Sequence, residues 1–95
     1  METLYVWEHG TAAAAAGAVG EALGLELELR DSSFYGGDYF TVERDLEQVI
    51  VLENYVEDDG EPFFPGAPVG AVCVEVSGFS EAHARLACVN GLRRA

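Results

Sequence analysis

Residues 48–54 carry the most distinctive pattern of the chain, because their apolar side chains fall on both parities of a two-residue repeat. Val49 and Val51 point to one side of an extended chain, and Ile50 and Leu52 point to the other. A strand with two apolar sides is covered on both of its faces. The pattern therefore predicts a strand that runs through the middle of a sheet.

Four other segments are predicted to be strands. Residues 25–30 alternate leucine with charged side chains, which indicates one buried face and one face in water. Residues 4–8, 38–43 and 71–76 are rich in β-branched and aromatic residues, which favour strands. Residues 44–47 connect two of these strands, and so short a connection suits an antiparallel hairpin.

Two segments have apolar residues at helical spacing. The first covers residues 12–23, with Thr11 as the expected N-cap and Gly24 as the expected C-terminal stop. The second is predicted over residues 81–92, with Ser80 as its N-cap. Its expected buried stripe comprises Ala82, Leu86, Val89 and Leu92. Both helices are amphipathic, so each covers a face of the sheet, and the pattern leaves open whether they share one.

The order of these segments is strand, helix, four strands and helix, with no internal repeat and no linker. A chain of 95 residues is long enough for one hydrophobic core. We therefore expect residues 1–95 to form a single α+β domain. Its mainly antiparallel sheet of about five strands would follow the order β-α-β-β-β-β-α, with both helices packed on the sheet.

The chain is strongly acidic, with 17 acidic and 5 basic residues and a net charge of -12. This charge disfavours nucleic acid and anionic membranes as direct partners and favours a basic protein. No basic segment precedes the alanines at 12–16, as a signal peptide requires, and no apolar stretch reaches membrane-spanning length. Two cysteines are too few for a disulfide framework, so we expect a cytoplasmic protein.

No group of residues specifies an enzymatic reaction, a cofactor or a metal. The residues available for a soft-metal or thiol site are His9, Cys73, His83 and Cys88. They lack the close paired spacing of a structural zinc motif. An EF-hand loop with its glycine at Gly60 would need an acidic residue at position 55, where Tyr55 stands. We therefore expect neither a cofactor nor a metal, and a protein that is not an enzyme.

Residues 57–68 hold all three prolines and four acidic residues, and they must form a loop. Phe63 and Phe64 stand between two of these prolines and admit two interpretations. Both rings cap the core, or at least one is an outward anchor for a partner that the acids attract. Tyr35 and Asp38, around a double glycine, would complete the same patch. The expected partner-binding residues are Tyr35, Asp38, Glu57, Asp58, Asp59, Glu61, Phe63 and Phe64.

Residues 33–40 and 52–62 together resemble a pattern in small uncharacterised bacterial proteins, some of which are similar to immunity proteins of toxin systems. The resemblance covers about the middle half of the chain and includes no catalytic position. It implies an acidic cytoplasmic protein that neutralises a basic toxin or enzyme by blocking its active-site cleft. One alternative is a phage-type inhibitor or DNA mimic that acts on a nuclease or DNA-binding protein. Another is a small enzyme or ligand-binding domain that uses Tyr35, Asp38 or His9.

Overall fold

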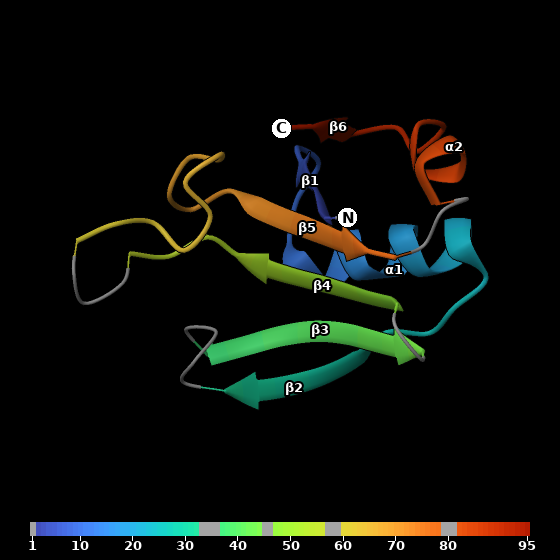
Figure 1. Cartoon of the computed structure of the whole chain (residues 1–95), viewed down its shortest axis with the longest axis horizontal. Helices are drawn as coiled ribbons and strands as arrows, with labels where there is room; N and C mark the ends of the chain where they lie inside the picture. The colour runs from blue at the N-terminus through green and yellow to red at the C-terminus, as the bar shows by residue number, and fades with distance from the viewer. Residues whose placement is uncertain (1, 33–36, 45–46, 57–59, 79–81) are drawn as a thin grey trace.

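The computed structural model describes residues 2–32, 37–44, 47–56, 60–78 and 82–95. The described strands form one antiparallel sheet in the order β2-β3-β4-β5-β1-β6 (Figure 1). The fold is therefore α+β, as the sequence predicts, with six strands instead of about five. The elements are β1 (Glu2–Trp7), α1 (Ala12–Leu23), β2 (Glu28–Ser32), β3 (Gly37–Arg44), β4 (Glu47–Glu53), β5 (Val72–Ser77), α2 (Ala82–Leu86) and β6 (Leu92–Arg94).

The predicted central strand is β4, which pairs with β3 on one side and β5 on the other. Val51 lies opposite Phe40 of β3 and Val74 of β5, so the hairpin between β3 and β4 is also confirmed. All four apolar residues at positions 49–52 are buried. Apolar side chains on both parities thus mark a strand with neighbours on both edges and cover on both faces.

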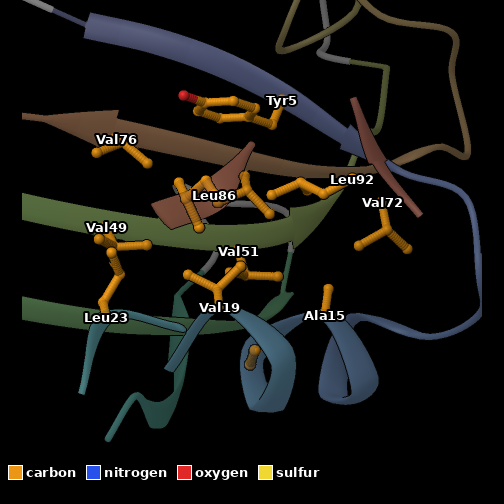
Figure 2. Packing of buried hydrophobic residues seen from close by; sticks show 12 residues of the cluster. Tyr5, Ala15, Val19, Leu23, Val49, Val51, Val72, Val76, Leu86 and Leu92 are labelled. Carbon is orange, nitrogen blue, oxygen red and sulfur yellow. The ribbon is translucent and has the colours of Figure 1, made fainter. Parts of the chain in front are cut away.

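Both helices lie on the same face of the sheet, which answers the question that the sequence left open. In Figure 2, Ala15, Val19 and Leu23 of α1 point toward the valines of β4. Leu86 of α2 belongs to the same cluster and is fully buried. The buried residues of this main core are Tyr5, Ala15, Ala16, Val19, Leu23, Val49, Val51, Val72, Val74, Val76, Leu86 and Leu92.

Helix α1 begins and ends where its sequence predicts. The Thr11 hydroxyl accepts a hydrogen bond of 3.2 Å from the amide of Ala14, as an N-cap does. Gly24 takes the left-handed conformation that ends the helix, and the amide of Leu25 donates to the carbonyl of Gly20 at 2.8 Å. The chain returns so closely here that a Cβ at position 20 would lie 2.6 Å from the carbonyl oxygen of Leu25. Glycine at position 20 is therefore a packing requirement.

The predicted C-terminal helix is wrong beyond Leu86, where α2 ends. Gly91 adopts a φ of 94° in a turn, and the chain then forms β6. Leu92 lies opposite Trp7 of β1 and is buried there. The predicted buried residues Leu86 and Leu92 are thus correct, but different elements bury them. The proposed N-cap Ser80 lies outside the described residues.

Strand β2 begins three residues later than predicted, at Glu28, because the amide of Leu25 closes the end of α1 and residues 25–27 stay irregular. The three leucines of the alternation do not share one environment. Leu27 packs partly against the main core, whereas Leu29 is 60% exposed. Helix α1 packs against β3, β4 and β5, so β2 lies beyond the cover that the helix provides.

In the described part of the chain, no helix is long and apolar enough to cross a membrane.

Candidate protein-binding surface

The second face of the sheet, which neither α1 nor α2 covers, is here called the open face. It holds a smaller apolar cluster of Val6, Ile50, Leu52, Phe64, Ala67 and Cys73. Strand pairing places Glu28 and Arg30 of β2 on the same face, beside Thr41 and Tyr39 of β3. Glu43 and Gln48 face the same side one strand pair further on. The open face is therefore apolar at one end and polar over β2 and β3.

Residues 60–71 fold back over the apolar end of the open face, and the side chain of Asn54 holds residues 64–68 there. Asn54 is only 2% exposed. Its amide nitrogen donates to the carbonyl oxygens of Phe64 at 3.1 Å, Ala67 at 3.0 Å and Pro68 at 3.1 Å. Its side-chain oxygen accepts from the amide of Phe64 at 2.9 Å. One buried side chain thus bonds four backbone groups of the loop, and it is the partner of the Phe64 amide and the Ala67 carbonyl, while the carbonyls of Phe64 and Pro68 also accept from the amides of Ala67 and Ala71.

The two adjacent phenylalanines have different environments. Phe64 is 7% exposed and belongs to the open-face cluster, so this ring caps the core. Phe63 is half-buried and meets Phe64 edge-on, with ring centroids 4.9 Å apart. Its other neighbour is Tyr55, which stacks on it at 5.1 Å with 18° between the ring planes. Phe63 therefore presents a partly exposed ring on a rigid support, which suits an anchor for a protein partner.

Tyr39 belongs to this surface, although the sequence analysis did not select it. Like Tyr55 and Phe63, it is half-buried and packs against the open-face cluster. We call Tyr39, Tyr55 and Phe63 the aromatic group. The alternation of β3 contains the signal for Tyr39, because Phe40 faces the helices and its neighbour must face the other side.

Tyr39 also lines a hollow of about 390 Å³ over β2 and β3. Arg30 forms an ion pair of 2.9 Å with Glu28 there, and the Gln48 amide donates to Glu43 at 2.8 Å. Three carboxylates and one guanidinium line the hollow, which is therefore acidic. Its lining residues are Glu26, Glu28, Arg30, Tyr39, Thr41, Val42 and Glu43.

Of the acidic residues expected at the partner site, Glu61 and Asp38 are described, and both are exposed. Asp38 lies directly opposite Asp31 of β2 and faces the helix side of the sheet. The start of β3, which holds Asp38, is at the same end of the sheet as residues 60–71 (Figure 1). The Asp38 side chain is not on the face that carries the aromatic group. Tyr35, Glu57, Asp58 and Asp59 lie outside the described residues, so their contribution stays a prediction.

The residues that a metal or thiol site would use are spread over the fold. Cys73 is fully buried, which raises the pKa of its thiol to about 11, whereas Cys88 is exposed. His9 packs against Trp7 with ring centroids 5.9 Å apart. His9 follows β1, three strand positions or about 14 Å from β3, so it does not converge with Asp38. Among the described residues, no group of three or more His, Cys, Asp or Glu side chains is placed to hold a metal ion.

The apolar end of this surface continues into two exposed valines. Val56 forms an isolated β-bridge with Pro62. Val69 is followed by Gly70, whose amide donates a hydrogen bond of 2.9 Å to the carbonyl of Asn54. Both side chains are more than half exposed, although the bridge and the hydrogen bond hold the backbone at these positions. Exposed apolar residues on a rigid segment are typical of binding surfaces.

Comparison with protein-family models, curated proteins and solved structures found no match to this chain.

Proposed function

We propose that this protein is a non-enzymatic, acidic binding protein that inhibits a basic toxin or enzyme by covering its active-site cleft, as an immunity protein does. The observation that carries the proposal is the open face, where a firmly held aromatic group lies beside an acidic hollow. Such a surface offers an apolar anchor and charge complementarity to the same partner.

The rigidity of the aromatic group supports this function. Asn54 fixes the backbone on both sides of Phe64, and Phe63 is held between Phe64 and Tyr55. A ring that is already ordered before binding loses little conformational freedom when a partner covers it. Phe63 is therefore the residue from which we expect the largest contribution to affinity.

The charge balance supports a basic partner. If each of the 5 basic residues neutralised one of the 17 acidic residues, 12 acids would still lack a basic counterpart within the chain. Among the exposed acids, Glu43 lies on the open face, and Glu61 lies in the loop that covers the apolar end of that face. Their field would steer a positively charged cleft toward the aromatic group. The proposal includes a cytoplasmic location, which the two free cysteines support.

The first experiment identifies the partner by affinity capture from the source cells, with the wild-type protein and a Phe63→Ala variant in parallel. We expect a basic protein that the wild type retains and the variant loses. Its identity separates a toxin from a host nuclease or DNA-binding protein, and an inhibition assay then uses the activity of that partner. Capture of acidic or neutral proteins alone would contradict the proposal.

The second experiment measures binding of that partner by variants matched in chemistry. Phe63→Ala should weaken affinity by about 2 kcal/mol, whereas Phe64→Ala should mainly lower folding stability, by about 3 kcal/mol. Glu43→Gln should slow association, whereas Glu21→Gln on the exposed side of α1 should not. Equal effects of the two glutamate variants, or unchanged affinity for Phe63→Ala, would remove the open face from the mechanism.

A further inference from the structure

Strand β2 is an edge strand, and one side of its backbone is available for pairing. It is the first strand in the sheet order and lies at the lower margin of the sheet in Figure 1. Its neighbour β3 uses the backbone groups on one side, so those on the other side point away from the sheet. The side chains of Arg30 and Glu28 are 58% and 68% exposed. An edge of this kind is a template for another strand.

The side chains of β2 are complementary to a second copy of the same strand. In an antiparallel pair centred on Leu29, the Leu29 side chains of the two copies would meet directly, on the helix side of the sheet. The same register would set Glu28 of each copy opposite Arg30 of the other, on the open face. Opposite charges and apolar pairs at directly opposed positions stabilise antiparallel strands.

Other registers lose this complementarity. The apolar and charged side chains of the two copies stay on matching faces of the sheet only when the register shifts by two residues at a time. A pair centred on Arg30 would set the two arginines against each other and Leu29 against Asp31. A pair centred on Glu28 would set the two glutamates against each other. Directly opposed like charges are unfavourable, so the pair centred on Leu29 is the preferred register.

We propose that this protein forms a two-fold dimer through antiparallel pairing of β2 with β2 of a second copy. The pairing would join two six-stranded sheets into one continuous sheet. It would cover the exposed Leu29, which helix α1 does not reach, and bond the outward backbone groups of β2. The Glu28–Arg30 pair within each chain, at 2.9 Å, would extend into a network of four charges across the two-fold axis.

The dimer is expected to be in equilibrium with monomer, because pairing of two five-residue edges makes an interface at the small end of the known range. Analytical ultracentrifugation of the full chain, over concentrations from about 10 μM to about 1 mM, covers such an equilibrium. The weight-average mass of the wild type should rise from 10.2 kDa toward twice that value. A mass that stays at the monomer value over this range would overturn the proposal.

Charge reversal provides the specific test. Arg30→Glu places acids at both position 28 and position 30, and Glu28→Arg places arginines at both, so each variant should remain monomeric alone. Their equimolar mixture should associate at least as strongly as the wild type, because both cross-strand pairs are then of opposite charge. Association of either variant alone at the wild-type level, or a monomeric mixture, would show that β2 is not the interface. Leu29→Lys leaves the charges of Glu28 and Arg30 in place, and this variant should associate more weakly than the wild type.

Discussion

Asn54 is the residue whose replacement most directly tests how the candidate surface is held. Asn54→Ala removes a side chain that donates to three carbonyl oxygens and accepts from the amide of Phe64. These bonds join the end of β4 to the loop that carries Phe63. We therefore expect both lower stability and weaker partner binding from this single change.

The magnitude follows from the number of bonds and from their burial. A hydrogen bond contributes about 1 kcal/mol net, and a buried backbone group left without a partner costs about 1–3 kcal/mol. Alanine at position 54 removes the partners of the Phe64 amide and the Ala67 carbonyl, whereas the carbonyls of Phe64 and Pro68 still accept from the amides of Ala67 and Ala71 at 3.2 Å. We expect the free energy of unfolding to fall by about 3 kcal/mol. In a domain of this size, that loss lowers the melting temperature by more than about 10 °C.

Urea denaturation followed by fluorescence of Trp7, with a thermal scan by circular dichroism, measures this loss. Gln48→Ala is the matched control, because it removes an amide whose 2.8 Å bond to Glu43 lies on the exposed surface. The control should change the free energy of unfolding by less than about 0.5 kcal/mol. Asn54→Asp keeps the acceptor but cannot donate to three carbonyls, so at neutral pH it should destabilise at least as much as alanine. Equal effects of Asn54→Ala and Gln48→Ala would refute the reasoning.

The remaining predictions concern two glycines and two thiols. Gly20→Ala should lower the free energy of unfolding by about 2 kcal/mol through the clash with the Leu25 carbonyl, whereas Gly17→Ala, which meets no atom within 4 Å, should raise it by about 0.5–1 kcal/mol. Equal signs in urea denaturation would contradict the close packing at Gly20. A thiol reagent at pH 8 should modify Cys88 within minutes and Cys73 only after unfolding. Rapid modification of both cysteines in the folded protein would contradict the burial of Cys73. Burial raises the pKa of Cys73 to about 11, so the stability that its neutral thiol provides should be present below pH 9 and be lost as the pH rises toward 11. In urea titrations at increasing pH, Cys73→Ala should reduce this loss of stability.

Local signals were sufficient to predict most of the fold. The N-cap at Thr11 and the stop at Gly24 lie within one turn of the helix that they delimit, so α1 was predicted residue for residue. The apolar parities of residues 49–52 depend only on strand geometry, and they correctly predicted a central strand. Both signals act within a few residues.

The C-terminal segment was mispredicted because distant contacts determine its structure. Leu86 and Leu92 fit a helical stripe as well as they fit their real positions. Their separation into α2 and β6 depends on β1, whose free edge pairs with Leu92–Arg94. Gly91, at a positive φ, provides the turn between them, and the amide of Glu8 donates to its carbonyl at 2.7 Å. The 85-residue separation between Glu8 and Arg93, which form an ion pair, explains why a local pattern did not reveal this strand.

The candidate surface was predicted only in outline. The sequence identified the proline-rich loop and its phenylalanines, but adjacent residues in a loop have no periodicity that separates a core ring from a partly exposed one. The difference depends on Asn54, ten residues before Phe64, whose side chain fixes the backbone so that Phe64 turns inward. Tyr39 was not predicted to be part of the surface, because the composition of residues 38–43 predicts a strand but does not indicate which face of that strand the helices leave uncovered.

Added salt should have opposite effects on the two proposed interfaces. A basic partner is attracted by the net charge of -12, and added salt screens that attraction, so association should slow as salt rises. Two copies of this chain repel each other through the same charge. Screening should therefore favour the β2 dimer, because the exposed Glu28–Arg30 pairs contribute less than this overall repulsion. A two-fold axis perpendicular to the sheet would place both open faces on one side of the dimer. Because salt screens both the repulsion between copies and the attraction of a basic partner, higher salt should increase dimerisation and slow association with the partner.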